Sequence, residues 1–231
     1  MGSSETVKKI IAKLQSEDAK VRAGAASILS TLDEEKAVVT ALIQALQDKD
    51  AKVRSNAAYS LGEIGTGNQS QLAVPALIQA LQDKDATVRS QATYGLYSIG
   101  NSNPSSLSKE VPVLIRALKD DDSQVRSNAV KALGTLREKV LSAFLPEFIK
   151  ALKDNDSEVR SYAAESLGRL KDKAESSVPN LIEALKDDDS QVRSNADGAL
   201  GRLGDKAAVK PLIEAFYVDD AKYGSYALGS L

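Results

Sequence analysis

A chain of 231 residues with 42% hydrophobic and 27% charged residues has the composition of a folded protein rather than of a disordered tail. Its 30 lysines and arginines against 32 aspartates and glutamates leave a formal charge of −2, so no overall positive field draws it to nucleic acid or to an anionic membrane. Cysteine and histidine are absent, which excludes disulfides, Cys/His zinc sites, thiolate nucleophiles and Ser-His-Asp triads.

The sequence carries no mark of membrane insertion or secretion. It holds no long uninterrupted apolar run, and the first residues lack the apolar core of a signal peptide. We therefore expect a cytoplasmic protein without membrane contact. Residues 1–4 are interpreted as a tag remnant or a disordered N-terminus.

A Val-Arg pair recurs along the chain at spacings of 32, 35, 37, 34 and 33 residues, and an aspartate stands three positions before each valine. The arginines are Arg22, Arg54, Arg89, Arg126, Arg160 and Arg193, and the aspartates are Asp18, Asp50, Asp85, Asp122, Asp156 and Asp189. This period predicts one repeat domain over residues 5–231. Its units are expected at about 5–36, 37–71, 72–109, 110–143, 144–176 and 177–207, followed by a degenerate or truncated unit at 208–231.

Each unit begins with an amphipathic stretch, of which residues 74–81 (VPALIQAL) are an example. Its apolar positions recur every three or four residues, which predicts a first helix, named helix A. Prolines share one column near the start of this helix, where a missing amide N–H costs least. They are Pro75, Pro112, Pro146, Pro179 and Pro211.

A short acidic turn leads to a second helix, named helix B. The aspartate before each Val-Arg pair has the chemistry of an N-cap, because its carboxylate can accept hydrogen bonds from free amides of the first turn. Counted from the valine as zero, offsets +4, +8 and +11 fall on one side of helix B and predict the core, as at Ala57, Leu61 and Ile64. Gly65 and Gly100, near the far end of this helix, are typical of helix ends.

The arginine at offset +1 lies at the edge of this core stripe, so we expect it to point toward the neighbouring unit. A partly buried guanidinium needs acceptors, and an aspartate of an adjacent turn is the obvious candidate. A comb of arginines that binds phosphates is the alternative. It is disfavoured because every arginine has its aspartate and sits beside core positions.

The segment VPALIQALQDKDATVRSQATYGLYSIG, with its proline in helix A and its Asp and Val-Arg at the start of helix B, resembles the HEAT repeat. The short, regular form is similar to the HEAT-like repeats of phycobilisome lyases. This resemblance covers nearly the whole chain and implies an all-α fold, an α-solenoid of about seven helix pairs with helix B lining the concave side. It also implies a ladder between repeats, in which the arginines of the Val-Arg pairs bind the aspartates that stand three positions before the valines.

Positions that the repeat itself does not need are candidates for binding. Offsets +3, +6 and +10 of helix B fall opposite the core, and there the units differ from one another. Tyrosine and arginine are enriched in binding hot spots. Tyr97, at offset +9, follows this column and is included with it. The predicted partner-binding residues are Asn56, Tyr59, Glu63, Gln91, Tyr94, Tyr97, Asn128, Lys131, Tyr162, Glu165, Arg169 and Arg202.

No motif for catalysis, metal binding or a cofactor stands out. The acidic turn at residues 120–122 suggests calcium, but an EF-hand loop that began at Asp120 would need glycine and glutamate where Val125 and Lys131 stand. Capping and solvation explain the acidic turns better. We expect no catalytic residue, no metal and no cofactor.

Three functions remain open. The first is a non-enzymatic scaffold that binds another protein on its concave surface. The second, implied by the resemblance, is a bilin lyase or a lyase subunit, for which Tyr59, Tyr94, Glu63 and Glu165 would be the acid, base and aromatic groups. The third is nucleic-acid binding, which is disfavoured because acidic residues dilute the field of the basic ones.

The last unit departs from the pattern. Tyr223, Tyr226 and Leu228 lie in a stretch that no later repeat would cover. Either the native chain continues beyond Leu231, or this end meets another chain, for example by self-association.

Overall fold

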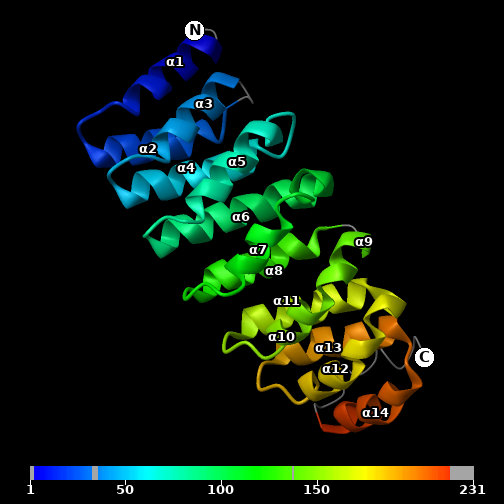
Figure 1. Ribbon diagram of the computed structural model, residues 1–231. Coiled ribbons are helices and arrows are strands. Elements are labelled where there is room, and N and C mark those ends of the chain that lie inside the picture. The colour runs from blue at the N-terminus through cyan, green and yellow to red at the C-terminus, as the bar shows by residue number, and fades with distance from the viewer. Residues whose placement is uncertain (1–2, 33–35, 137, 219–231) are drawn as a thin grey trace. The chain divides into compact units, whose positions relative to one another are not determined.

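The computed structural model describes residues 3–32, 36–136 and 138–218, and within these ranges it contains helices, turns and loops but no β-strand (Figure 1). The chain divides into two compact units, residues 1–136 and residues 137–231. Among the described residues, every helix is too short or too polar to cross a bilayer.

The first unit consists of four helix pairs, with the odd-numbered helix of each pair as helix A and the even-numbered one as helix B. The pairs are α1 (Ser3–Lys13) with α2 (Ala19–Leu29), α3 (Lys36–Ala45) with α4 (Ala51–Ile64), α5 (Ser70–Ala80) with α6 (Ala86–Ser102), and α7 (Val111–Ala117) with α8 (Ser123–Gly134). A short 3₁₀ helix, η1 (Pro104–Leu107), lies between α6 and α7.

The second unit repeats this plan. It begins with α9 (Glu138–Leu141) and η2 (Ser142–Phe144), and its helix pairs are α10 (Leu145–Ala151) with α11 (Ser157–Arg169) and α12 (Val178–Ala184) with α13 (Ser190–Leu203). The connections are η3 (Lys171–Ser177) and η4 (Lys206–Ala208), and the last helix A is α14 (Val209–Val218). Stacked helix pairs of this kind confirm the predicted α-solenoid.

The predicted start of each helix B is confirmed. Asp18, Asp50, Asp85, Asp122, Asp156 and Asp189 are all N-caps, and their carboxylates accept hydrogen bonds from backbone amides of the first helical turn. The proline column lies in the first turn of α7, α10, α12 and α14. Pro75 is an exception, because α5 begins five residues earlier at Ser70 and the proline lies inside it.

The predicted core of helix B is also confirmed, since Ala57 and Leu61 are fully buried and Ile64 is 3% exposed. The interpretation of Gly100 as a helix end is wrong. Helix α6 continues to Ser102, and a β-carbon on Gly100 would lie 2.4 Å from the Thr135 hydroxyl oxygen, so this glycine serves close packing instead.

Successive B helices pack directly on one another: α2 on α4, α4 on α6 and α6 on α8 in the first unit, and α11 on α13 in the second. Small residues permit this approach. A β-carbon on Gly62 would lie 2.3 Å from the Gly95 α-carbon of the next B helix, which is far inside van der Waals contact. The buried Ser60 hydroxyl donates a hydrogen bond of 2.8 Å to the Ala26 carbonyl of the preceding B helix.

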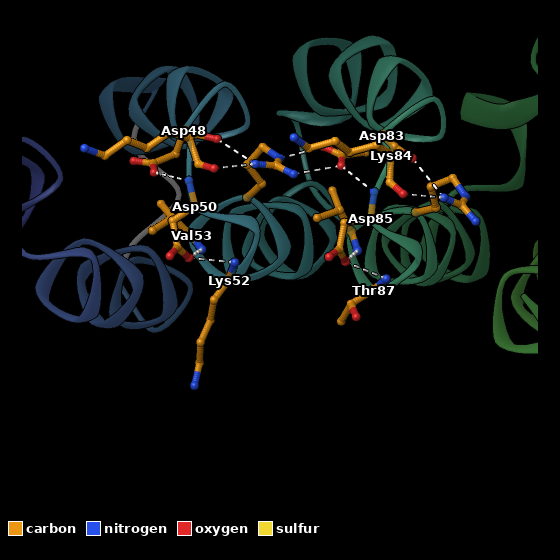
Figure 2. A network of polar contacts seen from close by, with 12 residues as sticks. Asp48, Asp50, Lys52, Val53, Asp83, Lys84, Asp85 and Thr87 are labelled. Carbon is orange, nitrogen blue, oxygen red and sulfur yellow. Dashed lines mark hydrogen bonds and ion pairs between the residues drawn. The ribbon is translucent and has the colours of Figure 1, made fainter.

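The arginines of four B helices, α2, α4, α6 and α11, reach the acidic turn of the following repeat, and Figure 2 shows part of this network. Nε and Nη2 of Arg54 donate to the two carboxylate oxygens of Asp83 at 2.6 and 2.9 Å. The same bidentate pair joins Arg22 to Asp48, Arg89 to Asp120 and Arg160 to Asp187. Such charge-assisted pairs are strong and fix the relative orientation of the two groups.

The same arginine also holds its own turn. Arg54 Nη1 donates to the Asp48 and Lys49 carbonyls at 2.8 and 3.2 Å, and these carbonyls follow the end of helix A. The Asp48 carboxylate in turn accepts from the Asp50 backbone amide at 2.9 Å. One guanidinium therefore braces the turn of its own repeat and the turn of the next.

The ladder uses different aspartates from those predicted. The arginines lie against adjacent turns, as expected, but their partners are the aspartates two positions before the N-caps. Wherever an arginine-aspartate pair is seen, the predicted ladder carboxylate is thus wrong. The predicted set was Asp18, Asp50, Asp85, Asp122, Asp156 and Asp189. The reason is that each N-cap carboxylate is already turned toward its own helix, as Asp50 is toward the Lys52 and Val53 amides.

Two glycines on B helices provide a matched test of the close packing. We expect Gly62→Ala to lower the free energy of unfolding by more than 2 kcal/mol, although alanine favours helix by about 1 kcal/mol, because the new methyl group meets the backbone of α6. Gly24→Ala should raise stability by up to about 1 kcal/mol, since nothing lies within 4 Å of a β-carbon there. Urea unfolding of both variants measures the difference, and equal effects would contradict the packing.

The ladder also predicts acid sensitivity. Hydrogen bonds from Arg22 and Arg54 hold the pKa of Asp48 and Asp83 below the ordinary value of 3.8. A lowered folded-state pKa stabilises the fold above pH 3.8, and this contribution is lost as the pH falls through the folded-state values. Thermal unfolding between pH 7 and pH 2.5 should therefore show a smaller acid loss for Asp48→Asn/Asp83→Asn than for the wild type. Identical pH profiles would argue against the pairs.

Candidate functional site

The B face is the surface formed by offsets +3, +6 and +10 of the B helices, where the sequence predicts partner binding. The structure separates these columns into two kinds. The asparagines at +3 bond to the preceding B helix, whereas the +6 and +10 columns include more exposed side chains.

Asparagines at offset +3 connect repeats. Asn56 Nδ2 donates to the Ala23 carbonyl at 2.9 Å, and Asn128 Nδ2 donates to the Ser90 carbonyl at 3.1 Å. Asn128 is only 3% exposed, so its prediction as a partner-binding residue is wrong. The close approach of the B helices brings this position within reach of the neighbouring backbone, and the side chain is used there.

Three predicted tyrosines form one cluster on α4 and α6. The rings of Tyr59 and Tyr94 are stacked, with centroids 5.8 Å apart and planes 8° from parallel. The ring of Tyr97 lies tilted against Tyr94 with centroids 6.1 Å apart. Tyr59 is 39% exposed, and the other two are half-buried. Neighbouring repeats thus present a joint aromatic patch on the B face.

A carboxylate accompanies the aromatic patch. Glu63 lies one turn beyond Tyr59 on α4, and it accepts a long hydrogen bond of 3.4 Å from the hydroxyl of Ser98, which lies one turn beyond Tyr94 on α6. Burial, the negative charge of Glu63 and the neighbouring tyrosines raise the pKa of Tyr94. The phenol therefore stays protonated and neutral at physiological pH.

The remaining predicted residues are more scattered. Gln91 on α6 and Lys131 on α8 are half-buried. In the second unit Tyr162 is half-buried, Glu165 and Arg169 form an ion pair of 3.0 Å within α11, and Arg202 is exposed. Among these residues no aromatic stack comparable to that of Tyr59 and Tyr94 is seen in the described part of the chain.

Sequence reasoning missed an open groove of about 390 Å³ between the starts of α2 and α4. It is lined by Lys20, Gly24 and Ser27 of α2 and by Lys52 and Asn56 of α4, among others. The sequence contained a sign of this groove. Gly24 occupies the +3 column, where the following B helices carry larger side chains that would fill the space.

These features suit binding at an open surface. In the described ranges no cluster of three or more acidic side chains is placed to hold a metal ion. The predicted contact residues of the last repeat, Tyr223, Tyr226 and Leu228, lie outside the described residues. The aromatic patch with its carboxylate is therefore the best-defined candidate site.

Similar structures agree with this architecture. An engineered protein has a TM-score of 0.70 and 24% identity over 86% of this chain and 96% of its own. A designed armadillo repeat protein in complex with the peptide (KR)4 has a TM-score of 0.67 and 21% identity, covering 85% of this chain and 99% of its own. The complex of CpcE and CpcF of phycocyanin lyase from Nostoc sp. PCC7120 has a TM-score of 0.56 and 27% identity, covering 97% and 86%.

No curated protein matches the chain. A family model described as HEAT repeats, however, matches residues 7–96, 74–147 and 145–229, which together span nearly the whole sequence. With the repeated helix pairs and the period of about 34 residues, this match is decisive: the chain belongs to the HEAT-repeat family.

Proposed function

We propose that this chain is a non-enzymatic scaffold that binds another protein along the B face, with Tyr59, Tyr94 and Tyr97 at the centre of the contact. The observation that carries the proposal is the stacked pair of half-exposed tyrosines contributed by two successive repeats. Tyrosine provides a large, rigid contact area together with a polar hydroxyl, and it is enriched in binding hot spots.

The repeat architecture does not require tyrosine at these positions. The +6 column holds Ser27, Tyr59, Tyr94, Lys131, Glu165 and Gly198. The fold tolerates each of these side chains at the same place in its repeat. The aromatic residues therefore serve something other than the stacking of helices, and recognition of a partner is the role that fits them best.

Two of the similar structures are complexes. The designed armadillo repeat protein is bound to a peptide, and CpcE is bound to CpcF. A stack of helix pairs of this kind offers an extended preformed surface, so binding can proceed without the entropic penalty of ordering the receptor. These complexes support a binding role for the fold but do not identify the partner of this chain.

A bilin lyase or lyase subunit is the second candidate. It is supported by the 27% identity to the phycocyanin lyase complex and by the position of Glu63 beside an aromatic patch. A shift of the visible absorption band of a bilin when the protein is added, absent with Glu63→Gln, would favour this function over a scaffold.

The scaffold proposal is tested by affinity capture. The protein and a Tyr59→Ala/Tyr94→Ala variant are immobilised, and the proteins that each retains from a lysate of the source cell are compared by mass spectrometry. We expect at least one protein to be retained by the wild type and lost with the variant, because the variant removes the aromatic contact area.

Leu72→Ala is the matched control, since Leu72 is also 39% exposed but lies on α5, an A helix. It should leave capture unchanged, and all three proteins should have similar melting temperatures. If the tyrosine variant retains the same proteins as the wild type, the aromatic patch is an ordinary part of the surface and the proposal is wrong.

A further inference from the structure

The aromatic patch has a definite internal arrangement. Tyr59 and Glu63 are separated by one turn on α4, and Tyr94 and Ser98 are separated by one turn on α6. The stacked rings of Tyr59 and Tyr94 join α4 to α6. One turn further along, the hydrogen bond from Ser98 to Glu63 joins the same two helices. A stacked tyrosine pair and one carboxylate thus belong to a single four-residue site.

The carboxylate of this site lacks a counter-charge. Among the described residues Glu63 makes no ion pair, and its hydrogen bond to the Ser98 hydroxyl is long at 3.4 Å. Glu63 is half-buried, so water solvates it incompletely. A charged group in such a place is stabilised when a cation approaches it.

The rings favour the same kind of ligand. The rings of Tyr59 and Tyr94 are stacked with almost parallel planes, so one face of each ring is turned toward the other ring. Tyr59 is 39% exposed, and it offers ring surface to a ligand. The face of an aromatic ring carries negative charge density and attracts a cation placed over it. A guanidinium is planar, stacks on such a ring and can donate to a carboxylate at the same time.

We propose that Tyr59, Tyr94 and Glu63 form a subsite for an arginine side chain of the partner protein. This proposal rests on the proposed function, because it names the group that the B face recognises. The guanidinium stacks on the exposed ring of Tyr59, which Tyr94 holds in place from the other side, and donates hydrogen bonds to the Glu63 carboxylate.

The probe is a capped tetra-arginine peptide, and the reference is capped tetra-citrulline, which has the same shape without the charge. Binding to the full chain is measured at 150 mM salt by titration calorimetry and by tyrosine fluorescence, which is visible because the chain has no tryptophan. We expect the arginine peptide to bind and the citrulline peptide not to bind. We also expect Glu63→Gln and Tyr94→Leu each to weaken binding about tenfold.

Glu5→Gln is the control. It changes the net charge of the protein by the same amount as Glu63→Gln, but Glu5 lies on α1, far along the chain from the patch. It should alter the dissociation constant less than twofold. An equal loss with Glu5→Gln, or equal binding of the citrulline peptide, would show general attraction or shape alone and would overturn the subsite. If the arginine peptide does not bind, but capture of a partner protein still depends on the tyrosines, the arginine subsite is wrong and the scaffold function stands.

Discussion

The bidentate ion pair between a helix B arginine and the aspartate of the next acidic turn is the interaction on which the stack depends. The same planar group holds two turns, since the guanidinium also donates hydrogen bonds to two backbone carbonyls of its own turn. Those carbonyls follow the end of a helix, where backbone acceptors lack helical partners. Loss of either charge would leave the other partly buried and unpaired, at a cost of about 3 kcal/mol.

The ladder lies at the turns, and this placement leaves the B face available for variation. Close packing of the B helices is secured by the glycine and serine positions and by the asparagine bonds to neighbouring carbonyls. The +6 column holds side chains as different as Ser27, Tyr59 and Glu165, so the stack does not fix the residue there. Tyrosine and glutamate can therefore be held there in fixed relative positions, and a rigid support of this kind is what a preformed binding site requires.

Much of this structure could be predicted from the sequence, because local rules decide it. The N-cap role of Asp50 and the burial of Leu61 follow from the positions of these residues in their own helix. The ladder partners could not be identified, since every turn that follows an arginine carries at least two aspartates and only the arrangement in space shows which one meets the arginine. Burial of Asn128 was missed for a similar reason: a single helix gives no measure of how closely the next one approaches.

The most direct test of the ladder is a double-mutant cycle on Arg54 and Asp83, whose side chains are only 8% and 13% exposed. The free energy of unfolding in urea is measured for the wild type, Arg54→Ala, Asp83→Ala and the double variant. The ladder predicts a coupling energy above about 1.5 kcal/mol, since the pair is charge-assisted and largely shielded from water. A coupling energy within about 0.3 kcal/mol of zero would show that the two side chains act independently, and it would contradict the central role given to this pair.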